Sequence, residues 1–161
     1  MPELICNTSP LQYLHQLGQL ELLHRLSGRA IVPPAVVDEL AAGKAAGFDV
    51  PSVGGHGWIT VRSPVAASAQ RLVADLGRGE TEVLMLALEL PGSVAVLDDA
   101  MARRVAFTLG INVTGTLGLL LDGKTAGWVP SVRPLLDRLQ ELGFWVSERA
   151  RTLFLRSAAE E

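Results

Sequence analysis

Short apolar runs alternate along the chain with longer segments in which leucine and valine recur every three or four residues. The runs at residues 3–6, 29–34, 58–61, 93–99 and 111–115 have the length of buried strands. Helical spacing is clearest between them, at residues 34–47, 79–90 and 99–110. Buried strands separated by helices are typical of a mainly parallel sheet covered on both faces. The pattern therefore predicts an α/β fold, a three-layer α/β/α sandwich.

Glycine and proline mark where further helices begin and end. Residues 9–28 hold two short helices broken at Gly18, and Pro34 suits the first turn of the next helix. Other helices are expected at 65–77, at 116–128, at 131–143 with Ser131 as the cap, and in a tail from about residue 147. Because no repeat or linker interrupts the pattern, we expect residues 1–161 to form a single domain with a C-terminal helical tail.

The composition excludes several classes of protein. Hydrophobic residues make up 48% of the chain and charged residues 19%, as in globular domains and unlike disordered chains. No apolar run reaches the roughly 18 residues of a membrane-spanning helix, and no secretion signal is recognisable. The single cysteine, Cys6, excludes an internal disulfide framework, so we expect a cytoplasmic protein.

The net charge of −3 argues against binding nucleic acid through overall charge, but a local basic rim remains compatible with it. Arg78, Arg103 and Arg104 neighbour acidic residues and are candidates to contact phosphates, with solvated helix faces as the alternative. The leucine-rich helices at 11–26 and the tail have more apolar positions than one face needs. We interpret this as contact in a homodimer or with a small protein partner, or as ordinary core.

Polar residues follow the predicted strands at the points where the strands end. Asn7 follows the first strand, Asp98 and Asp99 follow “VAVL”, and Thr114 follows “INV”. Binding sites in parallel sheets form at the carboxyl ends of the strands. The alternative is that Asp98 or Asp99 simply caps the following helix, which needs only one carboxylate. Two adjacent carboxylates repel each other, and a bound cation would relieve this repulsion.

Two further acids come from predicted helices, Glu39 in “VVDEL” and Glu80 in “GRGETE”. Their alternatives are a solvated helix face and an acid that complements the helix dipole. If acids from such distant segments converge at one sheet edge, they offer the oxygen ligands that Mg²⁺ prefers. A bound cation of this kind activates water and neutralises charge on a phosphate.

Several stretches in order resemble proteins of the PIN-domain family: “ICNTSPL”, “IVPPAVVDEL”, “LGRGETEVLMLALEL”, “VAVLDDAMARRVAFTLGINVTGTLGLLL” and “LLDRLQELGFWVSE”. The resemblance covers about residues 4–150 and points to the bacterial and archaeal branch related to the VapC toxins. It implies an α/β/α sandwich whose cluster of acids binds Mg²⁺ or Mn²⁺ and cleaves RNA. It also implies the toxin half of a toxin–antitoxin pair, with a small antitoxin protein as partner.

The resemblance assigns metal-binding and catalytic roles to Glu39, to Glu80 and to Asp98 or Asp99. The family's first acid, the aspartate of a “D-T-S” stretch, falls on Asn7. An asparagine can donate its carbonyl oxygen to a cation or cap the following helix. It carries no negative charge, however, so we expect weaker metal binding.

Hydroxyl side chains near these acids complete the predicted site. Ser9 is expected to supply a hydroxyl, with Thr114 and Thr116 behind the ligands, and ordinary capping at strand ends is the alternative. Two functions remain open: a ribonuclease weakened by Asn7, or a catalytically inactive PIN-fold protein that binds RNA or a protein partner. “GLLLDGKT” at 118–125 matches a phosphate-loop pattern, but three consecutive leucines favour a buried helix there, so nucleotide binding is a remote third option.

Overall fold

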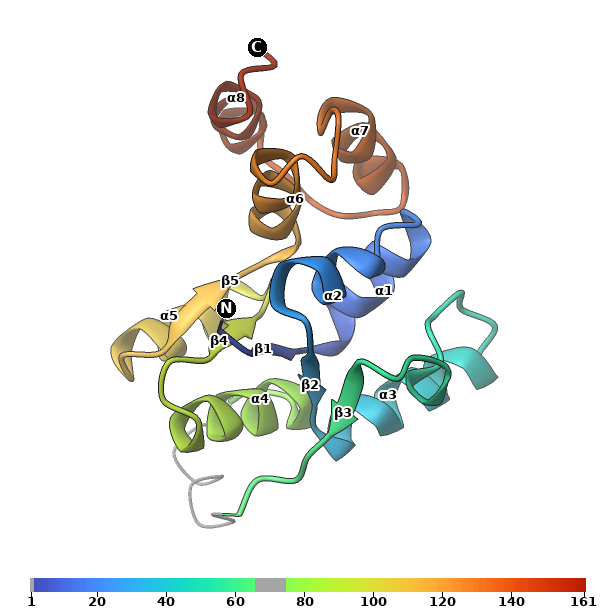
Figure 1. The fold of residues 1–161 in the computed structure, drawn as a ribbon, viewed down its shortest axis with the longest axis vertical. Helices are drawn as coiled ribbons and strands as arrows, with labels where there is room; N and C mark the ends of the chain where they lie inside the picture. The colour runs from blue at the N-terminus through green and yellow to red at the C-terminus, as the bar shows by residue number, and fades with distance from the viewer. Residues whose placement is uncertain (1, 66–74) are drawn as a thin grey trace.

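A computed structural model describes residues 2–65 and 75–161, and their fold is an α/β sandwich (Figure 1). One parallel sheet of five strands has the order β3-β2-β1-β4-β5. The strands are β1 (Leu4–Cys6), β2 (Ala30–Val32), β3 (Ile59–Val61), β4 (Val94–Val96) and β5 (Asn112–Thr114). The fold class and the positions of the predicted strands are thus confirmed.

Helices cover both faces of the sheet (Figure 1). One face carries α1 (Thr8–Gln16), α2 (Glu21–Ser27) and α6 (Thr116–Thr125); the other carries α4 (Arg78–Glu89) and α5 (Ala100–Thr108). α3 (Pro34–Ala45) packs against both α1 and α4, and the short turn η1 (Val53–Gly55) precedes β3. α7 (Arg133–Glu141) and α8 (Glu148–Ser157) lie beyond α6, and α8 begins close to residue 147, where the helical tail is expected.

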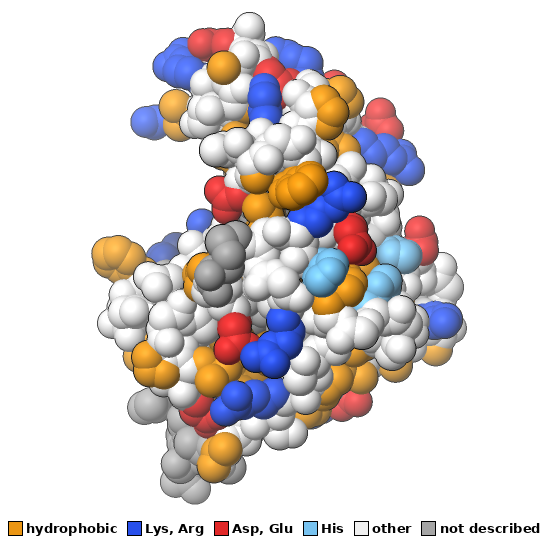
Figure 2. All heavy atoms as spheres, in the orientation of Figure 1, with side chains coloured by type: hydrophobic (Ala, Val, Ile, Leu, Met, Phe, Trp, Pro, Cys, Tyr) orange, Lys and Arg blue, Asp and Glu red, His pale blue; other side chains and the backbone are white. Residues whose placement is uncertain are grey.

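The central strands are apolar at every position because both of their faces are covered. β1 and β2 are fully buried, whereas the edge strands β3 and β5 are partly exposed. Most leucines of α1 and α2, including Leu11, Leu14 and Leu23, belong to the same core. For these two helices the ordinary-core interpretation is therefore correct. Acidic and basic side chains are mixed over the visible face of the molecule (Figure 2).

Some boundaries differ from the predictions. Gly18, at φ 70°, separates α1 from α2 as expected. The helix expected at 65–77 lies largely outside the described residues. The predicted Ser131 cap is wrong, because Val132 occupies that position of α7 and the Ser131 hydroxyl donates to Glu160 instead. Residues 118–125 lie within α6 and form no phosphate loop. None of the described helices is long and apolar enough to cross a membrane.

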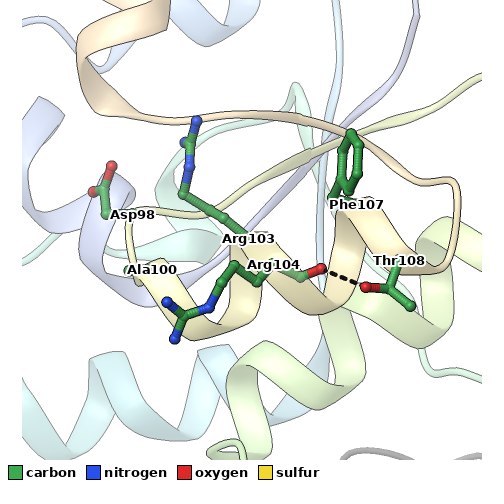
Figure 3. Close-up of a pocket in the computed structure, with 6 residues that line it drawn as sticks. All are labelled: Asp98, Ala100, Arg103, Arg104, Phe107 and Thr108. Carbon is green, nitrogen blue, oxygen red and sulfur yellow. Dashed lines mark hydrogen bonds between the residues drawn. The ribbon is translucent and has the colours of Figure 1, made fainter.

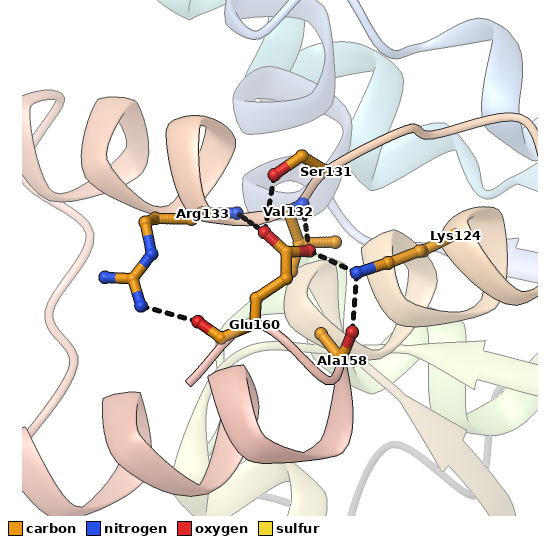
Figure 4. A network of polar contacts seen from close by, with 6 residues as sticks. All are labelled: Lys124, Ser131, Val132, Arg133, Ala158 and Glu160. Atoms are coloured by element: carbon orange, nitrogen blue, oxygen red, sulfur yellow. Dashed lines mark hydrogen bonds and ion pairs between the residues drawn. The ribbon is translucent and has the colours of Figure 1, made fainter.

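The tail is fastened to α6 by one carboxylate, that of Glu160 (Figure 4). Its oxygens accept hydrogen bonds from Lys124 Nζ at 2.7 Å, Ser131 Oγ at 2.5 Å and the backbone N–H groups of Val132 and Arg133 at 2.7 and 3.0 Å. Burial opposes ionisation of Glu160, but these donors outweigh it and lower the pKa of the carboxyl to about 2. Three segments, α6, the start of α7 and the end of α8, are thus joined at one point.

Candidate active site

The carboxyl ends of β1 and β4 lie where the order of the sheet reverses. From β1 the strands continue outward to β2 and β3, and from β4 they continue the other way to β5. Cys6 pairs with Val96, so Asn7 and Asp98 follow adjoining strand ends, and the Asn7 N–H donates to the Val96 carbonyl at 3.1 Å. Open α/β sheets bind ligands at such a point.

Asn7 is only 3% exposed, and its side chain does not cap α1. Its Nδ2 instead donates to Glu80 Oε1, in α4, at 3.2 Å. Its Oδ1 is buried and has no hydrogen-bond partner among the described residues. A buried oxygen left in this state costs roughly 1–3 kcal/mol, so the atom is a candidate ligand for a cation.

Gly79, in the first turn of α4, lets Asn7 Oδ1 approach the helix backbone closely. A Cβ at Gly79 would lie 2.8 Å from that oxygen and would collide with Glu39 Oε1. The two oxygens therefore face the same small space. The other carboxylate oxygen of Glu39, Oε2, accepts a hydrogen bond from Thr8 Oγ1 at 2.9 Å, which fixes Glu39 beside the start of α1.

Contacts between α3 and α4 position the two glutamates. Glu82 is 9% exposed and accepts the backbone N–H of Ala35 at 2.7 Å, which satisfies a donor at the start of α3. Arg78 and Asp38 form an exposed ion pair at 3.6 Å between the same helices. The role of Glu82 was missed, because the sequence predicts only a solvated acid near the start of a helix at this position.

Asp98 and Asp99, which the sequence leaves equivalent, have different partners. Asp99 is exposed and caps α5 by accepting the Ala102 N–H at 2.9 Å. Asp98 turns toward the start of α6 and accepts both the N–H and the hydroxyl of Thr116, at 2.8 and 2.7 Å. Burial raises the pKa of Asp98, and the Thr116 hydrogen bonds and the charge of Arg103 oppose the rise.

The predicted hydroxyl residues are only partly where we expected them. None of the hydrogen bonds between described residues involves the Ser9 side chain, and the neighbouring Thr8 supplies the hydroxyl that binds Glu39. Thr116 is in direct contact with Asp98. Thr114 Oγ1 instead lies against Gly118 of α6. A Cβ at Gly118 would collide with this hydroxyl oxygen.

The donors at this sheet edge suit a hard divalent cation. Within residues 2–65 and 75–161, no three Asp, Glu, His or Cys side chains form a group able to hold a metal ion. Asn7 lies beside both acids: its Nδ2 donates to Glu80, and its Oδ1 lies with Glu39 Oε1 against Gly79. Mg²⁺ is commonly held by one or two protein carboxylates and keeps several waters. The residues present therefore fit Mg²⁺ or Mn²⁺, with one charge fewer than three carboxylates would supply.

Comparison with protein families gives a match over nearly the whole chain. A family model described as a PIN domain matches residues 3–160. No curated protein sequence matches the chain.

Proposed function

The chain belongs to the PIN-domain family, and from that premise we propose that it is a metal-dependent ribonuclease. The observation that carries the proposal is the buried Asn7 Oδ1, which has no partner in the described part of the chain and lies together with Glu39 Oε1 against Gly79. A further part of the proposal, based on the resemblance to the VapC branch, is a role as the toxin of a toxin–antitoxin pair.

In this proposal Glu39, Glu80 and Asn7 hold Mg²⁺ or Mn²⁺. Asp98 is the additional carboxylate at the site, because Asp99 is occupied as a helix cap. When bound, the cation supplies a Lewis acid that neutralises charge on the phosphodiester and activates water.

The remaining contacts orient these groups. Thr8 Oγ1 fixes the Glu39 carboxylate, and Asn7 Nδ2 fixes that of Glu80. Arg103 Nη1 is held by the Leu97 carbonyl at 3.0 Å, next to Asp98, where its charge attracts a phosphate.

Replacing Asn7 by aspartate tests the proposal, since it restores the charge that the family's pattern has there. Wild type, Asn7→Asp and the double variant Asn7→Asp/Glu80→Gln are compared for Mn²⁺-dependent cleavage of short RNAs. We expect the Asn7→Asp variant to cleave at least about tenfold faster than wild type, because a charged ligand binds the cation more tightly. Addition of Glu80→Gln should abolish the gain. Absence of cleavage in all forms contradicts the ribonuclease.

Asn7 itself favours a second candidate, a catalytically inactive PIN-fold protein that binds RNA or a protein partner. The Asn7 amide already donates a hydrogen bond to Glu80, so the folded site depends less on a bound cation to stabilise the Glu80 carboxylate. Binding of RNA without cleavage, in both wild type and Asn7→Asp, identifies this function.

We also propose a homodimer or antitoxin contact on the helical tail. Trp145 and Leu153 are exposed there, at 84% and 49%. Light scattering of wild type and a Trp145→Ser variant, with and without a small basic protein encoded in the neighbouring reading frame, tests this contact.

A further inference from the structure

Two neighbouring hollows lie along the surface of α5, and Figure 3 shows the residues of the first, which begins at Asp98. The first has a volume of about 640 Å³ and is lined by Asp98, Ala100, Arg103, Arg104, Phe107 and Thr108. The second, of about 420 Å³, shares Arg104 and Thr108 with it. The helical residues of the first hollow recur every three or four positions, so they form one stripe along α5. This stripe continues the candidate active site outward from Asp98.

The positive charge in the stripe is accessible to a ligand, although Arg103 also donates to the Leu97 carbonyl and lies near Asp98. Arg103 and Arg104 are exposed, and neither forms an ion pair with a carboxylate among the described residues. Five other described arginines are paired with acids, namely Arg29, Arg78, Arg138, Arg151 and Arg156, whereas Arg25, Arg62, Arg133 and Arg149 form no such ion pair with a described residue. Two adjacent unpaired guanidiniums beside the active-site edge are typical of phosphate contacts.

Phe107 adds an aromatic ring to this charged stripe. It is 86% exposed, and its ring projects from α5 on the same side as the Arg103 side chain (Figure 3). One exposed phenylalanine by itself has no special meaning. A ring one turn beyond a free guanidinium, however, is the combination with which proteins bind single-stranded nucleic acid, since bases stack on the ring and phosphates contact the cations.

We propose that α5 is a subsite for single-stranded RNA, in which Phe107 stacks on an unpaired base while Arg103 and Arg104 contact the neighbouring phosphates. The proposal rests on the proposed function, because Asp98 marks where cleavage occurs. An α-helix rises 1.5 Å per residue, so Phe107 lies on the order of 10 Å along α5 from Ala100, which is two residues after Asp98. The stacked base is therefore separated from the cleaved bond. A base inside a duplex is already stacked and paired, so the subsite selects single strands.

The experiment measures binding in EDTA, so that it does not depend on cleavage. A short single-stranded RNA containing 2-aminopurine is titrated with wild type, Phe107→Ala, Phe107→Trp and Phe48→Ala. Phe48 is the matched control, because it is 60% exposed and lies beyond the end of α3. Stacking contributes enough that Phe107→Ala should weaken binding about tenfold and abolish quenching of the 2-aminopurine fluorescence. The Phe107→Trp and Phe48→Ala variants should bind as wild type does.

Arg104→Ala provides an independent measurement, with Arg149→Ala, an exposed arginine of α8, as control. Loss of one phosphate contact should lower the slope of log affinity against log salt by about one for Arg104→Ala only. The inference is overturned by equal affinity for a blunt RNA duplex, by absence of RNA binding, or by unchanged RNA binding in Phe107→Ala. A change in oligomeric state of Phe107→Ala with unchanged RNA binding assigns the surface to a protein interface instead, and also overturns it. Phe107-dependent binding without cleavage in Mn²⁺ overturns only the ribonuclease.

Discussion

Two carboxylate sites in this chain are built in opposite ways. Glu160 accepts hydrogen bonds from two side chains and two backbone N–H groups, and its pKa is lowered to about 2. At the sheet edge Glu39 and Glu80 each accept a single hydrogen bond from another side chain. Burial raises the pKa of the nearby Asp98, and Asn7 Oδ1 is without a partner in the described part of the chain.

The difference separates a structural carboxylate from carboxylates available for a ligand. A carboxylate has about four acceptor positions, and those of Glu160 are filled by the chain's own donors. Glu39 is exposed and Glu80 is half-buried, so the remaining acceptor positions of these carboxylates are accessible from solvent. Among the oxygens at the sheet edge, only Asn7 Oδ1 is buried and without a partner in the described part of the chain, so it is the atom that most favours a ligand from outside the chain.

The largest effect is expected from filling the space at Gly79. In Gly79→Ala the new methyl group occupies the position that Asn7 Oδ1 and Glu39 Oε1 face, so Mn²⁺ affinity should fall about 10- to 100-fold. Gly54→Ala is the control, because a Cβ there meets open space. Calorimetric titration with Mn²⁺ measures the affinity, and a melting curve confirms folding. Equal Mn²⁺ affinity in Gly79→Ala and wild type would remove this space from the proposed metal site.

The next effect concerns Glu160 and should leave metal binding unchanged. Glu160→Gln places an amide NH₂ against donors, so we expect the free energy of unfolding to fall by about 1–3 kcal/mol. Glu161→Gln is the control, because Glu161 is exposed and its side chain bonds only Arg156 among the described residues. Urea denaturation at pH 7 measures the difference. A loss of Mn²⁺ affinity in Glu160→Gln would show that the two sites are coupled.

The difference in unfolding free energy between wild type and Glu160→Gln should depend on pH. The pKa of Glu160 is lowered in the folded state, from 4.5 to about 2, so its stabilising contribution is fully present above pH 4.5. It is lost as the pH falls through 2. The free-energy difference between wild type and Glu160→Gln should therefore be constant from pH 5 to 7 and shrink below about pH 4.5.

The smallest effect is expected from Asn7→Asp in the absence of metal. The Asn7–Glu80 hydrogen bond becomes a contact between two carboxylates, so the variant in EDTA should lose about 1 kcal/mol, or roughly 2–4 °C in melting temperature. Mn²⁺ should raise the melting temperature of Asn7→Asp more than that of wild type. Asn112→Asp, an exposed position on β5, is the control. Identical melting of Asn7→Asp and wild type in EDTA would contradict the role of the amide.

The sheet could be predicted because its signal is local. Each buried strand is a short apolar run between turn residues, and the parallel arrangement follows from the helices that separate the runs. The terminal helix starts close to where its pattern predicts, with Ser147 accepting the Ala150 N–H as cap. Ser131 was mispredicted because its hydroxyl bonds Glu160, a residue that no local pattern connects to it.

The sequence predicts which types of residue gather at the site better than it predicts the hydrogen-bond partner of each side chain. Asp98 and Asp99 are neighbours of the same chemistry, and only the direction of the backbone at the start of α5 decides which one caps the helix. The choice between Thr8 and Ser9 depends in the same way on which hydroxyl faces α3. The role of Gly79 follows from side chains of two other segments, which no pattern around residue 79 contains.

The position of Glu160 has a practical consequence for protein engineering. Chain ends are commonly trimmed because most terminal residues are loosely held. Deleting the last two residues here would strip Lys124 of its counter-ion and leave the first backbone donors of α7 exposed to solvent. Shortened versions for crystallisation should therefore keep Glu160, and any affinity tag at this end should follow Glu161.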